Sequence, residues 1–235
     1  MFVNSIILKG IKHVFFDLDH TLWDFDRNSA LCFQQIFNEN NIALDLDVFL
    51  AKYKHINTNY WKLYREEKVS KSALRYGRFK DTFAALSFKL SDDEINALSD
   101  AYIKNLTNHN YLLDGAVSLL DYLQEKYQLY IITNGFEEVQ KLKLVKSNID
   151  RYFKTITTSE KVGVKKPNPK VFQYALEISG AKKEESVMIG DNYEADIQGA
   201  LEFGLKAIYL EDSNSIFLNN NVLKVNSLNQ LKQYL

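Results

Sequence analysis

The sequence predicts an α/β protein in which a parallel sheet with helices on both faces receives an inserted all-helical domain. Three observations support this fold class. A buried-strand pattern stands alone at 13–18, helical periodicity then continues for roughly eighty residues, and strand and helix patterns alternate after Gly115. Because the first strand is as continuously apolar as the later ones, we expect it to join their sheet. The expected core is 1–22 with 110–235, and the expected cap domain is 23–109.

The first strand is expected at 13–18, where the chain reads HVFFDL, a short apolar run typical of a strand buried on both faces. The apolar run at 2–8 is followed by Lys9 and Lys12 and has no small-residue cleavage site. That run therefore indicates folded structure rather than a signal peptide.

The inserted block is expected to be helical because its apolar residues recur at spacings of three and four. No strand pattern interrupts it. Ser91 with Glu94 predicts a capping box, and Ser70 predicts a second helix start. The expected helical segments lie at 31–41, 47–68, 72–86 and 91–106.

The remaining chain alternates between the two kinds of element, which predicts a parallel sheet with right-handed helical crossovers. Ligands of such sheets bind outside the carboxyl ends of the strands. Helices are expected at 116–127, 136–147, 169–179 and 194–204, and strands at 128–133, 154–159, 186–190 and 206–210.

Composition excludes several classes of protein. With 46% apolar and 25% charged residues among 235, the chain should fold, and its net charge of −1 favours neither a nucleic-acid polymer nor a membrane surface as partner. The single cysteine, Cys32, excludes an internal disulfide, and the four histidines lack zinc-site spacing. Nor does any stretch approach the ~20 apolar residues of a membrane span. These features indicate a cytoplasmic protein.

Polar residues that could carry chemistry follow four of the expected strands. Each alone is weak, because carboxylates at strand ends often serve only as helix caps or turn formers. Together they supply the parts that phosphoryl transfer to a carboxylate requires. The residues are Asp17 and Asp19, then Thr133, Asn134 and Gly135, then Lys166, and finally Asp191 and Asp196.

A carboxylate that attacks a phosphate dianion needs its negative charge offset. A divalent cation held by Asp17 and Asp191 would do so, and hard oxygen ligands favour Mg²⁺. Lys166 would add a second positive charge. The Thr133 hydroxyl, with the N–H groups of Asn134 and Gly135 at a helix start, would bind the remaining phosphate oxygens.

Asp19 lies two residues after Asp17, so both side chains can face one pocket where the chain leaves strand geometry. Asp17 would then attack phosphorus, and Asp19 would protonate the leaving alcohol and later accept a proton from water. Pro167 and Pro169 directly follow Lys166, where they would hold the lysine in place or simply start a helix.

The motifs DLDHT at 17–21, ITNG at 132–135, VGVKKPNP at 162–169 and GDNYEAD at 190–196 resemble, in order, the four motifs of the haloacid dehalogenase superfamily. The resemblance spans nearly the whole chain. It implies a Rossmann-like core with a helical cap, Mg²⁺ as cofactor, and Asp17, the Asp19 carbonyl and Asp191 as metal ligands.

The resemblance also implies further roles. Asp17 would be the nucleophile and Asp19 the acid and base, with Thr133 and Lys166 on the phosphate and Asp196 behind the metal ligands. Lys166 is chosen over Lys165 because the family's lysine directly precedes the proline. His20 stands where the family commonly has glycine.

The segments TLWDFDRNSA, LRYGRF, DGAVSLL and SEKVGVKKPNPKVFQYAL resemble the bacterial pyrimidine 5'-nucleotidases that act on non-canonical nucleotides. Specificity is expected to come from the cap, where aromatic rings and arginine planes could stack on a base. The candidates chosen by residue type are Trp23, Tyr64, Arg65, Tyr76 and Arg78.

Several alternatives remain open at this point. The chain could hydrolyse small phosphorylated metabolites such as phosphoglycolate or sugar phosphates, or it could be a phosphomutase. A dehalogenase is disfavoured because halide needs no acid such as Asp19 to leave. A phosphate-binding signalling or interaction module is the non-enzyme alternative. The protein could be a monomer or a homodimer.

Overall fold

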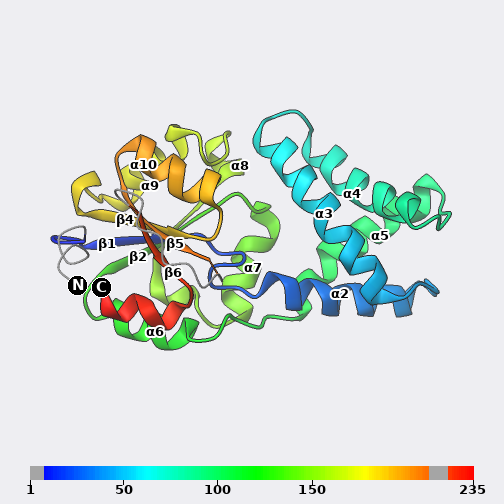
Figure 1. Ribbon diagram of the computed structural model, residues 1–235, viewed down its shortest axis with the longest axis horizontal. Helices are drawn as coiled ribbons and strands as arrows, with labels where there is room; N and C mark the ends of the chain where they lie inside the picture. Colours follow the sequence, from blue (N-terminus) through cyan, green and yellow to red (C-terminus); the bar gives the residue numbers. More distant parts are fainter. Residues whose placement is uncertain (1–7, 212–221) are drawn as a thin grey trace. The chain divides into compact units, whose positions relative to one another are not determined.

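The computed structural model describes residues 8–211 and 222–235 (Figure 1), so most of the apolar run at 2–8 lies outside the described residues. The chain divides into two compact units. The sheet unit contains the segment that ends at Phe25 and the segment that starts at Asn110, and the helical unit is Asp26–His109.

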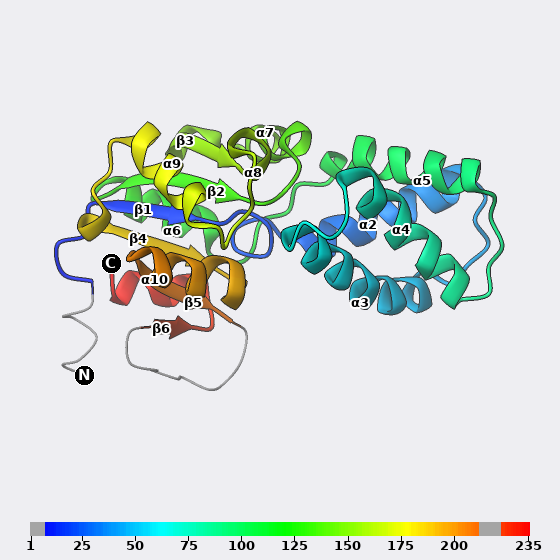
Figure 2. The ribbon, with the colours of Figure 1, turned by 90° about the horizontal axis from the view of Figure 1, so that it is seen from above.

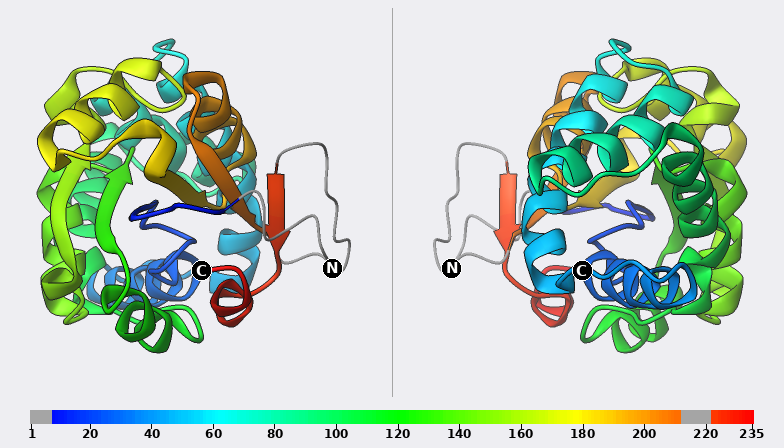
Figure 3. Two further views of the ribbon diagram at one scale, coloured as in Figure 1. Left: turned by 90° about the vertical axis from the view of Figure 1, so that its left-hand side faces the viewer. Right: turned by 90° about the vertical axis from the view of Figure 1, so that its right-hand side faces the viewer.

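Among its described residues, the sheet unit has six parallel strands in the order β3-β2-β1-β4-β5-β6. This is the strand order of doubly wound nucleotide-binding folds, whose topological switch point lies between β1 and β4. The edge strand β6 precedes the C-terminal turn η5, Leu228–Gln233 (Figure 3). The strands are β1, His13–Phe16; β2, Gln128–Thr133; β3, Phe153–Thr158; β4, Ser186–Gly190; β5, Lys206–Leu210; and β6, Val222–Val225.

The register of the central strands brings their carboxyl ends to one level. Phe16, the last residue of β1, pairs with Ile131 of β2 and with Ile189 of β4. The residues that follow these strands therefore emerge at the same edge of the sheet.

Helices cover both faces of the sheet, with α9 and α10 on one face and α6 on the other (Figure 1). Phe15, Ile132 and Met188 belong to the core that α9 and α10 cover, together with Phe172 and Ala200 from those helices. The helices of this unit are α6, Ala116–Gln124; α7, Glu137–Lys146; α8, Ser159–Val162; α9, Pro169–Ser179; and α10, Gly199–Phe203, preceded by the π-helix η4, Tyr193–Gln198.

The helical unit contains four α-helices (Figure 2). Its core is aromatic, with Phe33 stacked on Tyr102 at 4.7 Å and in contact with Phe49 at 4.8 Å between ring centroids. Such ring pairs contribute beyond the apolar area they bury. The helices are α2, Phe25–Glu39; α3, Leu46–Arg65; α4, Lys71–Ala85; and α5, Asp92–Asn105, followed by the short turn η1, Leu106–Asn108.

Both predicted helix starts in this unit are confirmed. The Ser91 hydroxyl accepts from the Glu94 N–H while the Glu94 carboxylate accepts from the Ser91 N–H, which is a complete capping box. Ser70 caps α4 by accepting from the Ala73 N–H at 3.1 Å.

The predicted fold class is confirmed, but several elements differ from the prediction. Helix α2 begins at Phe25 rather than residue 31, and the short helix α8 was not predicted. β1 ends at Phe16 rather than residue 18, because the Leu22 and Trp23 N–H groups both donate to the Leu18 carbonyl and close a turn. The helix expected at 194–204 is divided into η4 and α10. Strand β6 was not predicted. Across 8–211 and 222–235, no helix combines the length and apolar character needed to cross a bilayer.

Candidate active site

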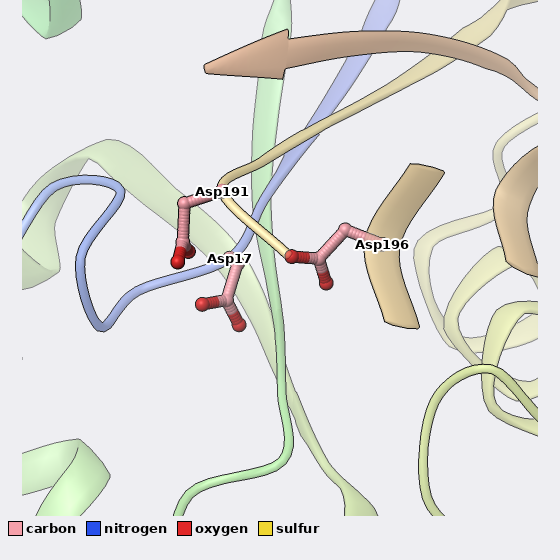
Figure 4. Close-up of side chains that lie close together, drawn as sticks. All are labelled: Asp17, Asp191 and Asp196. Atoms are coloured by element: carbon pink, nitrogen blue, oxygen red, sulfur yellow. The ribbon is translucent and has the colours of Figure 1, made fainter. Parts of the chain in front are cut away.

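The site centres on carboxylates that emerge from the two central strands. Asp17 directly follows β1, and Asp191 directly follows β4. These strands flank the switch point of the sheet, where ligands of such folds bind. One oxygen from each of Asp17, Asp191 and Asp196 lies within 4.8 Å of the others, and the three side chains converge (Figure 4).

Asp196 reaches this cluster from the π-helix η4. The Asn192 N–H donates to Asp196 Oδ2 at 3.0 Å, and the Asn192 side chain caps the turn by accepting from the Ala195 N–H at 2.9 Å. A Cβ atom at Gly190 would lie 2.4 Å from Asp196 Oδ2, so only glycine leaves room for this carboxylate. Widened turns of this kind occur often at functional sites.

Lys166 lies against the cluster and is 1% exposed. Its Nζ is 2.7 Å from Asp17 Oδ1 and 2.6 Å from Asp196 Oδ1, and it donates to the Ile132 carbonyl at 2.6 Å. A buried ammonium thus joins the end of β1 to η4. Lys165, the alternative considered from the sequence, is only partly buried.

The loop that carries Lys166 is held by Asn134. Asn134 Oδ1 accepts from the Lys166 N–H at 2.8 Å, and Asn134 Nδ2 donates to the Lys166 carbonyl at 3.0 Å. The Asn134 side chain therefore positions Lys166, and only its main-chain N–H remains a candidate for phosphate binding. Pro169 occupies the first turn of α9, as its helix-start interpretation predicts.

Thr133 is the last residue of β2 and is 1% exposed. Its hydroxyl accepts from the Gly135 N–H at 3.0 Å. Two of the three groups that were expected to bind phosphate oxygens, the Thr133 hydroxyl and the Gly135 N–H, therefore contact each other shortly before α7 begins.

The Asp19 side chain is not part of the cluster of three carboxylates. Its two oxygens accept from residues of α7, Oδ1 from Lys143 Nζ at 2.5 Å and Oδ2 from Gln140 Nε2 at 3.0 Å. Next to it, His20 has φ +62°, a left-handed conformation that glycine adopts without strain. This explains why glycine suits that position in the motif.

Burial and mutual repulsion dominate the electrostatics of the cluster. Burial raises the pKa of Asp17 well above its usual range, and Asp196 and Asp191 add to the effect although Lys166 opposes it. Burial, reinforced by Asp196, raises the pKa of Asp191 to about 7, against the hydrogen bond from Thr21. Burial lowers the pKa of Lys166, but Asp17 and Asp196 outweigh it and raise that pKa overall. The cluster would therefore bind added positive charge favourably.

The donor set suits a small, hard cation. The three clustered side chains offer only carboxylate oxygens, which are the ligands that Mg²⁺ and Ca²⁺ prefer. Thr21 donates to Asp191 Oδ1 at 3.0 Å and so orients one of these carboxylates. Asp196 is one of the three clustered carboxylates, and its expected place behind the metal ligands stays a prediction.

The five residues chosen as specificity candidates differ in exposure. Trp23 groups with the sheet unit and is fully buried, and Tyr64 is also buried. Arg78 is 1% exposed in the helical unit, with its guanidinium 5.1 Å from the centroid of the Tyr102 ring. Arg65 is partly exposed, as is Tyr76, whose hydroxyl donates to Asp92 at 2.5 Å. Substrate contact for these residues stays a prediction.

Sequence reasoning missed Gln140, Lys143 and Thr21. Gln140 and Lys143 are three positions apart on α7 and share a buried face with Val139 and Leu144. Polar residues within an apolar helical stripe are a signal that could have marked this face. The partner on the other side of the contact, Asp19, is more than 120 residues away in sequence and could not be inferred.

Two known proteins match most of the length of this chain. The chain is 34% identical over 198 residues to the pyrimidine 5'-nucleotidase YjjG of Escherichia coli, covering 84% of both chains. It is 34% identical over 200 residues to the pyrimidine 5'-nucleotidase PynA of Streptococcus pneumoniae, covering 84% of this chain and 83% of that one.

Among solved structures, the putative HAD-hydrolase YfnB of Bacillus subtilis bound to magnesium matches with a TM-score of 0.86 at 30% identity. The match covers 96% of this chain and 98% of that one. The family model of the haloacid dehalogenase-like hydrolases matches residues 14–210, which include all four strand ends of the site. The chain therefore belongs to the haloacid dehalogenase-like hydrolase family.

Proposed function

We propose that this chain is a magnesium-dependent phosphatase that hydrolyses pyrimidine nucleoside 5'-monophosphates through a phosphoryl intermediate on Asp17. The observation that carries the proposal is the convergence of Asp17, Asp191 and Asp196 with the buried Lys166 at the switch point of the sheet. The two pyrimidine 5'-nucleotidases of similar length support the substrate class.

In the first half-reaction, an Asp17 carboxylate oxygen attacks phosphorus and the bond from phosphorus to the nucleoside 5'-oxygen breaks. The electron pair leaves with that oxygen, which takes a proton from Asp19. Lys166, in contact with Asp17, offsets negative charge on the phosphoryl oxygens as they approach. The products are the nucleoside and an acyl phosphate on Asp17.

In the second half-reaction, water attacks the phosphorus of the acyl phosphate and Asp19 accepts a proton from that water. The bond between phosphorus and the Asp17 oxygen breaks, which restores the carboxylate and releases inorganic phosphate. Asp19 is then protonated again for the next turnover, so the two half-reactions balance.

We assign the cation to Asp17 and Asp191, with the Asp19 carbonyl as a further ligand and Asp196 beside them. When bound, Mg²⁺ would neutralise charge on the phosphoryl oxygens and lower the repulsion between nucleophile and substrate. The raised pKa of Asp17 and that of Asp191 support this assignment, because burial, reinforced by the neighbouring carboxylates, disfavours their negative charge and a bound cation would offset it.

We further propose that the helical unit acts as a cap that supplies contacts to the base, since covering units commonly control access and specificity. Arg65 and Tyr76 are the candidates with partly exposed side chains. The low cysteine content and the nucleotide substrate favour a cytoplasmic location.

The test is release of inorganic phosphate from a panel of nucleoside, sugar and short-acid monophosphates, with Mg²⁺ and with a chelator. We expect pyrimidine nucleoside monophosphates to show the highest kcat/KM and the chelator to remove activity. If phosphoglycolate or hexose phosphates are the better substrates, the nucleotidase assignment fails and the phosphatase assignment stands. Transfer of phosphate to a sugar instead of water would indicate a mutase.

Asp17→Asn is the mechanistic control for the same assay. It removes the nucleophile but keeps the side-chain volume, so we expect turnover to fall to background while the circular dichroism spectrum stays unchanged. Retention of substantial turnover would overturn the covalent mechanism.

A further inference from the structure

Lys143 lies in an unusual place for a lysine. It belongs to α7, yet only 2% of its side chain is exposed, and its Nζ contacts Asp19 Oδ1 at 2.5 Å. The ammonium also lies 4.3 Å from the centroid of the Trp23 ring and 5.3 Å from that of Phe25. The ammonium thus contacts two aromatic rings as well as a carboxylate.

Gln140 completes the contact one helical turn earlier. It is fully buried, and its Nε2 donates to Asp19 Oδ2 at 3.0 Å. Each oxygen of Asp19 thus has its own donor from the same face of α7, which fixes both the position of the carboxylate and the rotation of its plane.

The backbone before α7 is shaped around this arrangement. A Cβ atom at Gly135 would lie 1.4 Å from Gln140 Nε2 and 3.2 Å from Asp19 Oδ2. Only a residue without a side chain lets Gln140 pass over this position to reach Asp19.

Stability alone explains this contact poorly, in which 2% of the Lys143 side chain and 20% of the Asp19 side chain are exposed. Removing a charge such as the Lys143 ammonium from water costs about as much as the attraction to its partner returns, and replacement of buried charges by apolar residues is often neutral or favourable. The buried face of α7 contains Gln140 and Lys143 beside Val139 and Leu144. The two polar residues are therefore more simply explained by their contact with the Asp19 carboxylate.

We propose that Lys143 and Gln140 are positioning residues that hold the Asp19 carboxylate at the point of proton transfer. This inference rests on the proposed function, in which Asp19 gives a proton to the leaving oxygen and then takes one from water. Both half-reactions depend on where that carboxylate lies, and a misplacement of about 1 Å can cost on the order of 100-fold in rate.

The experiment compares two substrates that differ in their need for an acid. The uridine 5'-oxygen of uridine 5'-monophosphate needs a proton in order to leave, because its alkoxide is a poor leaving group. In contrast, p-nitrophenolate leaves from p-nitrophenyl phosphate without a proton. Lys143→Met removes the ammonium but keeps the unbranched stem. We expect kcat for the nucleotide to fall roughly 10- to 100-fold with KM little changed.

With p-nitrophenyl phosphate, the same variant should form the acyl phosphate at nearly the normal rate but hydrolyse it slowly. We therefore expect a burst of p-nitrophenolate equal to the enzyme concentration, followed by a slow steady rate. Gln140→Met should show the same pattern in weaker form. Lys141→Met, an exposed lysine of the same helix, is the matched control and should keep wild-type kinetics.

A second comparison keeps the inference testable if Lys143→Met is poorly stable. If Gln140 acts through Asp19, then Gln140→Met should add no further loss of turnover to Asp19→Asn. A further loss in the double variant, an equal fall for both substrates without a burst, or unchanged or faster turnover would each overturn the positioning role. If the wild-type protein itself releases no phosphate from either substrate, the proposed function fails instead.

Discussion

At the scale of single residues, the site is governed by negative charge that the protein itself only partly compensates. Three carboxylates meet, and the buried ammonium of Lys166 contacts two of them, Asp17 and Asp196. Burial then makes ionisation of Asp17 and Asp191 costly, which their raised pKa values express. The clustered carboxylates therefore lower the stability of the folded chain but favour binding of a cation, and such perturbed groups are common at functional sites.

Asp191 allows this cost to be measured. Its pKa rises from 3.8 to about 7 on folding, so between these values the folded chain binds more protons than the unfolded chain. Stability contributed by the bound proton is present at low pH and is lost as the pH rises toward 7. We expect Asp191→Asn to raise the free energy of unfolding of the metal-free protein by roughly 2 to 4 kcal/mol near pH 8, and by less near pH 5.

Urea denaturation in the presence of a chelator checks this expectation. Comparing the variant with the wild type at each pH cancels the titration of the carboxylates outside the cluster. The difference in free energy of unfolding between Asp191→Asn and the wild type should be larger at pH 8 than at pH 5. If it is the same at both pH values, or smaller at pH 8, the raised pKa of Asp191 is not the cause.

At the scale of elements, each part of the site depends on how a strand or helix ends. β4 ends at Gly190, whose missing side chain admits Asp196. β2 ends at Thr133, and the side chain of the next residue, Asn134, makes two hydrogen bonds with the main chain of Lys166. These local terminations bring together groups that are far apart in sequence.

The capping box of α5 makes a quantitative prediction for the helical unit. Ser91→Ala removes the acceptor for the Glu94 N–H, and we expect the free energy of unfolding to fall by about 1 kcal/mol. The matched control is Thr58→Ala in α3, where the hydroxyl only donates back to the Lys54 carbonyl and its loss should cost almost nothing. Urea midpoints at constant slope give both values, and equal effects of the two changes would refute the capping argument.

At the scale of the whole molecule, cation binding should couple to the stability of the sheet unit. A ligand at about 100 times its Kd that binds only the folded state contributes roughly 2.7 kcal/mol. We expect saturating Mg²⁺ to raise Tm by about 5 to 10 °C relative to chelator at neutral pH, because for a domain of this size 1 kcal/mol corresponds to about 2 to 4 °C.

Thermal unfolding followed by circular dichroism measures this shift without reference to activity. Asp191→Asn should lose most of the shift, while the Ser91→Ala variant should retain it. A full magnesium shift in Asp191→Asn would mean that the cation binds elsewhere.

Much of the fold could be predicted because its signals are local. The buried run that became β1, the capping box at Ser91 and the later alternation of strands and helices are properties of neighbouring residues. β6 was missed because Val222–Val225 is a short run without a clear pattern, and it is specified by its pairing with β5. The π-helix at 193–198 was missed because helical periodicity does not distinguish a widened turn.

The sequence by itself determined the class of fold, the order of most of its elements and the residues that stand at the strand ends, because backbone preference and apolar spacing act over a few residues. Only the tertiary structure decided which of those side chains meet. It placed Asp196 in the carboxylate cluster and Asp19 against Lys143 and Gln140. Contacts between residues more than a hundred positions apart depend on how the strands are ordered and how α7 packs, and no local pattern records them.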